Sequence, residues 1–322
     1  MQPRLKWKIR WWFAVILLMV LGPYFYSRAL SPWRAVTVHV TKGLVAPQTS
    51  SPEKTIRIVT YNIAHGRGQT GGNWDGGDTA TRQKRLQDIA DLLAEENPDV
   101  VVLNECDFDS TWSHHVNQAE VIAAAMNMPY RVEQRNLDFR FVYGSWRFGN
   151  VVISRFPIRK AELLDLPGYS WWETLAVGKK RGVLCWIELP DSTLIRVVAT
   201  HLSHRTEDAR VQGARELKFH SGDSKLPLIV AGDLNSAPRG FSDFEKDRSG
   251  HNAVEVLLKD GWLSTIPQPP ADARFLTFPS HQPDQVIDWI MVSEDLRFAS
   301  YHVIQSNLSD HCPVVADVVF KK

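Results

Sequence analysis

The chain has 322 residues, of which 44% are hydrophobic and 23% are charged, as in an ordinary globular protein. This composition excludes a disordered or fibrous chain, and the length allows one large α/β domain or two small ones. The formal net charge of +1 gives no global attraction toward nucleic acid or an anionic surface, although a local basic patch is compatible with it.

The N-terminus has the pattern of a membrane anchor. Basic residues precede an uncharged apolar stretch at 11–26 that carries aromatic residues at both ends. Because basic residues favour the cytoplasmic side, we expect a cytoplasmic segment at 1–10, a transmembrane signal-anchor at 11–28, and a catalytic part exported to the periplasmic or extracytoplasmic side. A cleaved signal sequence is the alternative, but no small-residue cleavage site follows directly. Residues 29–54 are rich in Pro, Ser and Thr and are expected to form a stalk.

The folded domain is expected to span 55–322, with more strands than helices. Apolar residues at helical spacing predict helices at 81–96, 117–127 and 207–220. Short apolar runs predict strands at 56–61, 99–104, 130–133, 141–143, 150–154, 161–166, 184–189, 194–201, 227–231, 286–292 and 314–320. Because turns separate many of these strands, the pattern favours an α/β or α+β sandwich of sheets with helices outside over a doubly wound parallel sheet.

The three cysteines, Cys106, Cys185 and Cys312, each lie in or beside an apolar run. None forms a C-x-x-C pair, so the spacing does not indicate a zinc site or a disulfide framework. We expect small buried apolar side chains, although two of them could pair if the fold brings them together.

Six segments share one design, in which an apolar run ends in a carboxylate, an amide or an imidazole. If the ends of the sheets converge, these side chains line one polar cleft. Oxygen ligands suit Mg²⁺ or Mn²⁺ better than zinc, and a carboxylate–imidazole pair suits polarisation of a phosphoryl oxygen or a water. Phosphoester hydrolysis is therefore the chemistry that fits best. The side chains concerned are Asn62, Glu105, His201, Asp233, Asn235, Asp288, Asp310 and His311.

The motifs "TYNI", "LNECD", "ATHLS", "GDLN", "IDWIMVS" and "SDHCPVV", in this order over 56–320, resemble the endonuclease/exonuclease/phosphatase superfamily. The resemblance implies a four-layer sandwich of two packed mixed β-sheets flanked by helices. It also implies metal-dependent phosphoester hydrolysis with Mg²⁺ or Mn²⁺ as the cofactor. Glu105 matches the principal metal ligand of the family, with Asn62 and Asp310 beside it.

The resemblance also implies roles for the catalytic side chains. Asp233 matches the residue that orients or deprotonates the attacking water, and Asn235 matches the amide that holds this water or a phosphate oxygen. His311 matches the imidazole that contacts the scissile phosphate, and Asp288 matches the acid that fixes its tautomer. His201 matches a second imidazole at the phosphate.

Some of these residues allow other interpretations. Asp288 inside an apolar run could belong to a buried structural salt bridge. Asn150 is interpreted as a substrate-binding or phosphate-binding residue, but it could equally cap a turn. Asn104 stands where many relatives carry Gln, and the shorter amide could shift the metal ligands.

The substrate is weakly determined by the sequence. The segment around Trp171 and Trp172 could enter a membrane interface, and Lys179, Lys180 and Arg181 could meet phosphates, whereas the simpler alternative is a loop packed on the domain. A nucleic acid or a phospholipid-type phosphodiester is therefore expected. A phosphomonoester substrate and a non-catalytic binding module are the alternatives. We expect a monomer without an obligate protein partner.

Overall fold

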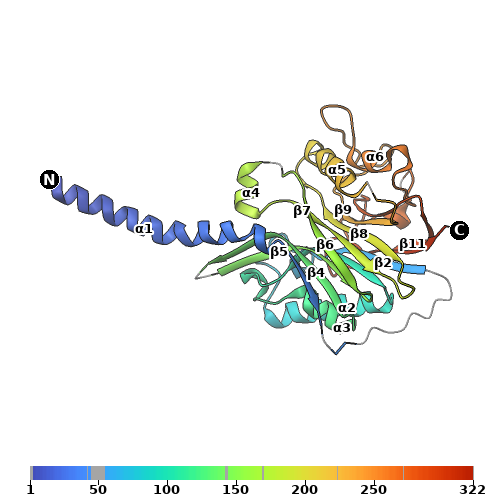
Figure 1. Ribbon diagram of the computed structural model, residues 1–322, viewed down its shortest axis with the longest axis horizontal. Helices are drawn as coiled ribbons and strands as arrows, with labels where there is room; N and C mark the ends of the chain where they lie inside the picture. Colours follow the sequence, from blue (N-terminus) through green and yellow to red (C-terminus); the bar gives the residue numbers. More distant parts are fainter. Residues whose placement is uncertain are drawn as a thin grey trace.

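Two mixed β-sheets pack face to face in a computed structural model that describes residues 3–41, 43–44, 55–141, 144–168, 170–222, 224–270 and 272–321 (Figure 1). In spatial order, the seven-stranded sheet contains β1 (Val36–Val40), β4 (Tyr130–Phe141), β5 (Gly144–Ser154), β3 (Val100–Asp107), β2 (Thr55–Asn62), β12 (Val314–Phe320) and β11 (Leu296–Val303). The five-stranded sheet contains β10 (Asp288–Val292), β9 (Leu228–Asp233), β8 (Leu194–His201), β7 (Arg181–Glu188) and β6 (Ile158–Asp165).

Helices cover the outer face of each sheet. The seven-stranded sheet packs against α2 (Thr79–Glu95) and α3 (Gln118–Ala125), and the five-stranded sheet against α5 (Glu207–Ser221) and α6 (Ala253–Leu258). A third apolar core fills the space between the sheets. The arrangement confirms the predicted four-layer sandwich. Each of these helices begins at a residue whose side chain accepts a backbone N–H of the first turn, namely Asp78, Asn117, Thr206 and Asn252.

Shorter helical segments lie in the connections. One α-helix, α4 (Trp171–Val177), precedes β7. The 3₁₀ turns are η1 (Pro32–Arg34), η2 (Ala64–Gly66), η3 (Thr111–Ser113), η4 (Lys259–Gly261) and η5 (Ala273–Phe275). All three cysteines are buried and free, as expected from their apolar surroundings.

Each sheet contains one parallel strand pair, and these two pairs position the site. Strand β2 runs parallel to β3, with Asn62 beside Asn104, and β8 runs parallel to β9, with His201 beside Asp233. Asp288 at the start of the antiparallel neighbour β10 also lies beside Asp233. Because the carboxyl ends of parallel strands share one edge of a sheet, the polar residues that end these strands come together.

The long hairpin of β4 and β5 was only partly predicted. The sequence suggests short separate strands at 130–133, 141–143 and 150–154, whereas β4 and β5 pair along 130–154 apart from residues 142–143, which lie outside the described residues. The charged residues of β4 conceal it, because Arg131, Glu133, Arg135 and Asp138 are buried and form ion pairs with one another. Strand β11 was not predicted, since most of its residues are half-buried or exposed and only Leu296 is fully buried.

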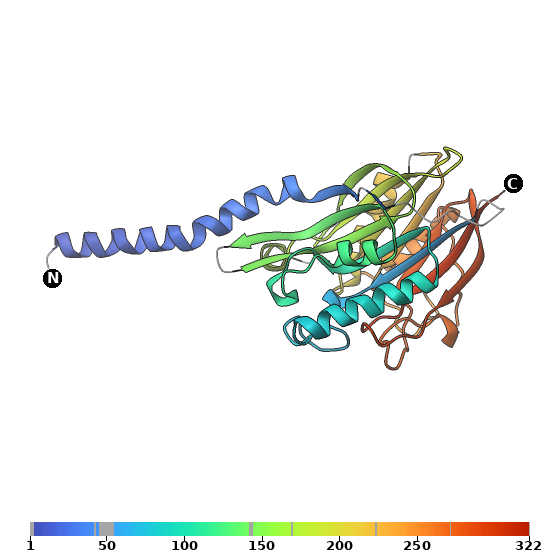
Figure 2. The same cartoon turned by 90° about the horizontal axis from the view of Figure 1, so that it is seen from below.

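The N-terminal helix α1 (Pro3–Leu30) projects from the domain as a single rod (Figures 1 and 2). Its segment Trp7–Leu30 is long and apolar enough to cross a membrane and is only 6% buried, a test that a signal sequence also passes. The predicted apolar helix is therefore present.

The stalk predicted at 29–54 differs from the structure over 32–40. These residues form η1 and then β1, which pairs antiparallel with β4 at the edge of the seven-stranded sheet. The helix itself is fastened to the domain, because Tyr24 Oη donates to the Leu175 carbonyl at 2.9 Å and Arg28 Nη2 to the Thr174 carbonyl at 3.2 Å. The domain therefore begins before residue 55. Residues 45–54 of the predicted stalk lie outside the described residues.

Candidate active site

A β-bulge in β3 turns Asn104 toward the second sheet and Glu105 toward a cavity. The pairing of β3 with β5 shifts register between Leu103 and Cys106, and Glu105 adopts a positive φ of 50°. Backbone strain of this kind is common beside functional sites. As a result, Asn104 is fully buried between the sheets and Glu105 faces a cavity.

Asn104 joins the two sheets directly behind the site. Its Oδ1 accepts the backbone N–H of Asp233 at 2.9 Å, and its Nδ2 donates to the Thr200 carbonyl at 3.0 Å. Gly232 leaves room for this approach, because a Cβ there would lie 3.1 Å from Asn104 Oδ1 and also 1.9 Å from the oxygen of Thr200 in the neighbouring strand. The shorter amide at position 104 is thus accommodated by close contact between the sheets.

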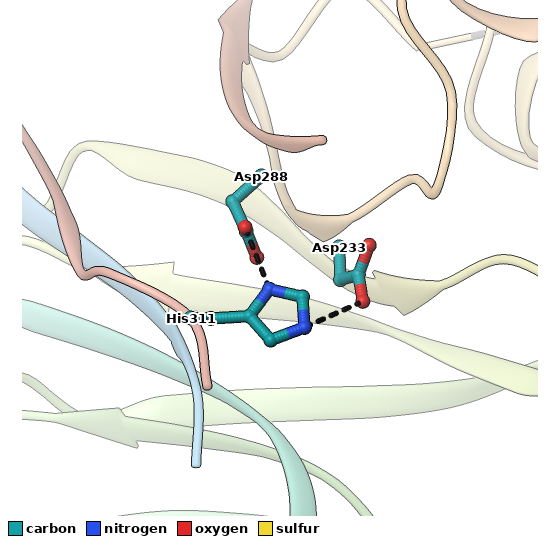
Figure 3. A group of neighbouring side chains, drawn as sticks. All are labelled: Asp233, Asp288 and His311. Carbon is teal, nitrogen blue, oxygen red and sulfur yellow. Dashed lines mark hydrogen bonds and ion pairs between the residues drawn. The ribbon is translucent and has the colours of Figure 1, made fainter. Parts of the chain in front are cut away.

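Asp233 lies at the centre of the polar cluster (Figure 3). Asn62 Nδ2 donates to its Oδ2 at 3.0 Å, and the backbone N–H of Asn235 donates to its Oδ1 at 2.8 Å. Two imidazoles face the same Oδ2, with His201 Nε2 at 3.5 Å and His311 Nε2 at 3.8 Å. Burial raises the pKa of the Asp233 carboxyl, which makes it a stronger base when ionised.

His311 and Asp288 form a hydrogen-bonded pair, with His311 Nδ1 at 2.8 Å from Asp288 Oδ2. Burial alone would lower the pKa of His311, but the Asp288 carboxylate outweighs it and raises the pKa to about 10. His201 differs, because burial and the positive charge of Lys180 lower its pKa well below the usual value. Of the two imidazoles that face Asp233, one is therefore protonated and the other neutral.

Glu105 is surrounded by positive groups. Burial would raise its pKa, but positive charge that includes that of His65 and Lys180 holds the pKa at about 2, so the carboxylate is ionised at neutral pH. His65 Nε2 lies 3.5 Å from Glu105 Oε2, and His65 Nδ1 lies 2.9 Å from Asp107 Oδ1.

The sequence analysis did not identify His65 or Lys180 as site residues. A signal for His65 was available, because it follows Asn62 by three residues in "YNIAHG", directly after the same strand. Its position depends on η2, in which Ala64 and His65 both have positive φ values. Lys180 had been considered as a phosphate contact in a loop, but nothing in the sequence placed it beside Glu105.

The remaining predicted residues lie at different distances from the polar cluster. Asp310 lies at the edge of the cluster, where Arg67 Nη2 donates to its Oδ2 at 2.7 Å. Asn235 has a positive φ of 49°, which turns the chain after β9 toward a second cavity. Asn150 is fully buried and does not reach either cavity. Its amide bonds to Asn104 at 2.8 Å and to Gln134 at 2.6 Å, so the predicted substrate contact is replaced by a position behind the site.

Two cavities meet at this cluster. The larger has a volume of about 770 Å³ and reaches Glu105, His65 and Lys180 at its inner end. The smaller, of about 440 Å³, is lined by Asn235 and His311 together with other polar groups. His204 and Arg205 line both cavities, so the two adjoin, with Glu105 in the larger and His311 in the smaller.

Residues 59–311 match the model of the endonuclease/exonuclease/phosphatase family. The chain belongs to this family. The match confirms the resemblance seen in the motifs and makes the protein, by family, a phosphoester hydrolase. Enzymes of this family generally depend on a divalent metal, and the buried acidic and imidazole groups are consistent with that. Among curated proteins, none matches the chain in sequence.

Solved structures of family members share the fold. A family protein from Beutenbergia cavernae is 20% identical, with a TM-score of 0.60 over 83% of this chain and 72% of that chain. The mannosyl-6-phosphatase of Bacteroides thetaiotaomicron is 19% identical, with a TM-score of 0.58 over 82% of this chain and 100% of its own. The catalytic domain of human Nocturnin is 17% identical, with a TM-score of 0.59 over 83% of this chain and 94% of its own. At these identities the likeness concerns the fold alone.

Two sets of side chains could hold a metal. Among the described residues, Asp233, Asp288 and His311 have ligand atoms within 4.8 Å of one another, but the close contact of His311 with Asp288 is that of a hydrogen-bonded pair. The set expected from the family, Glu105 with Asn62 and Asp310, offers the oxygen donors that a hard cation prefers. Glu105 is also ionised, as a ligand must be. The second set therefore stays the predicted metal site.

Proposed function

We propose that this protein is a membrane-anchored, exported phosphodiesterase that depends on Mg²⁺ or Mn²⁺. The observation that supports this proposal best is the convergence of Asp233, the His311–Asp288 pair and Glu105 at the junction of two cavities. A diester has two arms on one phosphorus, and two cavities that meet at the catalytic groups can receive one arm each.

In this proposal Asp233 accepts a proton from the attacking water. Asn62 and the backbone N–H of Asn235 hold both of its oxygens, which fixes the direction of the basic lone pair. His311, protonated through its contact with Asp288, presents a positive Nε2–H toward the same place, where it donates to a phosphoryl oxygen. His201 is neutral and lies 3.5 Å from the same Asp233 oxygen, suited to a hydrogen bond rather than to a charge.

A divalent cation, when bound, would neutralise charge on the phosphoryl oxygens. Glu105 would be its main ligand, with Asn62 and Asp310 beside it. Arg67 must release Asp310 for this, since it now donates to the Asp310 carboxylate at 2.7 Å.

The first experiment uses the full chain purified in lipid vesicles. We expect hydrolysis of bis(p-nitrophenyl) phosphate with magnesium, loss of this activity on chelation and recovery on adding magnesium or manganese. Asp233→Asn should be inactive, and Asp91→Asn, on the exposed face of α2, is the matched control. Full activity after chelation would contradict the metal requirement, and an active Asp233→Asn variant would contradict the role of Asp233.

A phosphomonoesterase is the second candidate, because one protein of the same fold is a mannosyl-6-phosphatase. Parallel assays with p-nitrophenyl phosphate separate the two candidates. Hydrolysis of the monoester alone would replace the diesterase proposal.

Export can be tested separately from activity. An alkaline phosphatase fused after Lys322 should be active, because that reporter works only outside the cytoplasm. A second fusion at the same position carries a reporter that works only in the cytoplasm. If this fusion is active and the alkaline phosphatase fusion is inactive, the proposed orientation is wrong.

A further inference from the structure

We propose that the larger cavity binds the apolar part of a membrane lipid, so that the substrate of this site is a lipid phosphoester of the bilayer that holds α1. The inference rests on the proposed phosphoesterase function and specifies its substrate class. Three features carry it: an aromatic wall, a separation of polar from apolar lining, and the position of α1.

An unbroken series of aromatic rings, which we call the aromatic wall, leads from α1 to the site. Tyr24 of α1 lies 5.3 Å from Phe139, and Phe139 lies 5.4 Å from Trp146. The series continues from Trp146 to Trp112 at 6.3 Å, from Trp112 to Phe148 at 5.8 Å and from Phe148 to His65 at 5.0 Å. All six residues line the larger cavity.

The lining of this cavity changes character along its length. Near the catalytic cluster it carries Lys180 and Arg205, together with Glu105. Toward α1 the lining consists of Tyr24, Phe139 and Leu175, whose carbonyl accepts from Tyr24 Oη. A cationic inner end and an apolar outer end match an amphiphile whose phosphate is held inside and whose hydrocarbon chain extends outward.

The outer end of the cavity lies beside the membrane-crossing candidate. Tyr24 belongs to the apolar helix and also lines the cavity. In both views the β4–β5 hairpin points in the direction of α1 and runs beside its end (Figures 1 and 2). Trp171 and Trp172 of α4 are 65% and 63% exposed on the same side, as aromatic residues at a bilayer surface are. A lipid could thus reach the cavity from the bilayer interface.

Aromatic rings also stack on nucleic acid bases, so a nucleic acid substrate must be distinguished from a lipid. A strand of nucleic acid would need cationic groups along the whole path for successive phosphates. In the larger cavity Lys180 and Arg205 lie near the catalytic cluster, whereas Tyr24 of α1 contributes to the outer end. The arrangement favours a single phosphate with an apolar chain.

The test measures kcat/KM for a homologous series of alkyl p-nitrophenyl phosphodiesters, from ethyl to octyl, with the full chain in vesicles of phosphatidylcholine. The leaving group is the same throughout, so the series isolates the alkyl arm. We expect kcat/KM to rise about threefold to fourfold for each methylene that the cavity buries.

Longer probes partition more strongly into the vesicles, and this raises the rate equally for every variant. The difference in chain-length dependence between variants therefore reports binding in the cavity. Phe139→Asp should abolish most of the chain-length dependence while lowering the ethyl rate much less, and Phe139→Leu should preserve the dependence. Phe219→Asp, at a 74% exposed position on α5 outside the cavity, is the control and should behave as the unchanged protein.

Equal chain-length dependence in Phe139→Asp and the unchanged protein would overturn the lipid inference. So would inhibition by a single-stranded oligonucleotide that Phe139→Asp relieves, because the aromatic wall would then stack bases. Failure of the underlying function looks different: the ethyl diester would not be hydrolysed by any variant, with or without magnesium.

Discussion

Two histidine–carboxylate pairs flank the site, and they make similar contacts in different surroundings. His311 Nδ1 meets Asp288 at 2.8 Å, and His65 Nδ1 meets Asp107 at 2.9 Å. In each pair burial would lower the histidine pKa, and the partner carboxylate raises it. Each histidine then turns Nε2 toward another carboxylate, at 3.8 Å for Asp233 and 3.5 Å for Glu105.

The two facing carboxylates differ in exposure and in charge. The Asp233 side chain is only 2% exposed, and burial raises its pKa. The Glu105 side chain is 28% exposed at the cavity, and several cations hold its pKa at about 2. One carboxylate is therefore suited to accept a proton and the other to stay ionised and bind a cation. The two histidine–carboxylate pairs have nearly the same geometry. Burial and neighbouring charges therefore decide which chemical role the facing carboxylate can take.

The largest expected effect concerns the His311–Asp288 pair. Asp288→Asn and His311→Ala should each lower kcat by about a hundredfold to ten-thousandfold, far more than they change KM. The double variant should lose little more, because residues that act as a unit are not additive. A structural salt bridge would instead lower the melting temperature and leave the folded fraction active. Turnover and melting curves of the three variants distinguish these results.

The next effect concerns Glu105. Removing its charge in Glu105→Gln should raise the half-saturating magnesium concentration by at least about tenfold, since ligand charge dominates binding of a hard cation. The measurement is a magnesium titration of diester hydrolysis. An unchanged titration would remove Glu105 from the metal ligands.

A smaller effect of opposite sign is expected for His65. His65 lies 3.5 Å from Glu105, and Asp107 raises its pKa, so its protonated form competes with a cation for Glu105. His65→Gln should therefore lower the half-saturating magnesium concentration at neutral pH by about threefold to tenfold. It should also weaken the pH dependence of that concentration. If His65→Gln instead abolishes turnover as His311→Ala does, the two pairs do not have the different roles described above.

The smallest effect on activity is expected for Glu133, a buried carboxylate far from the cluster. Burial opposes its ionisation, but hydrogen bonds from His39 and Asn117 and the charge of Arg135 hold its pKa at about 2. Glu133→Gln should leave turnover unchanged and lower the free energy of unfolding by about 3 kcal/mol at neutral pH.

The sign of the pH dependence follows from the lowered pKa of Glu133. Its stabilisation is present above the pKa of the unfolded chain and is lost as the pH falls from about 4 toward 2. Denaturant melts of both proteins across this range should converge at low pH. A constant difference would show that Glu133 contributes by packing instead of by charge.

The sequence predicted those site residues that end buried strands. Asn62, His201 and Asp233 follow apolar runs, and parallel pairing brings such ends together whatever the details of the loops. A sandwich of sheets with helices outside was likewise predictable from the apolar runs, whereas its four layers were implied by the family resemblance.

Features that depend on distant partners were not predictable. The buried charges of β4 concealed half of a hairpin, and β1 was taken for stalk because only its pairing with β4 makes it a strand. Asn150 was interpreted as a substrate contact because its hydrogen bonds to Asn104 and Gln134 are invisible in the sequence. Lys180 enters the site only through the folding of a loop that the sequence left undefined.

The passage from α1 through η1 into β1 has a mechanical consequence. A flexible tether lets a domain sample a volume, and its encounters with substrate then depend on tether length. Here Tyr24 and Arg28 donate to backbone carbonyls of α4, and η1 alone separates the helix from the strand that enters the sheet at Val36. With α1 in a bilayer, the cavity mouth would be held close to the membrane surface. Turnover should then follow the mole fraction of substrate in the surface rather than its bulk concentration, as in a search confined to two dimensions.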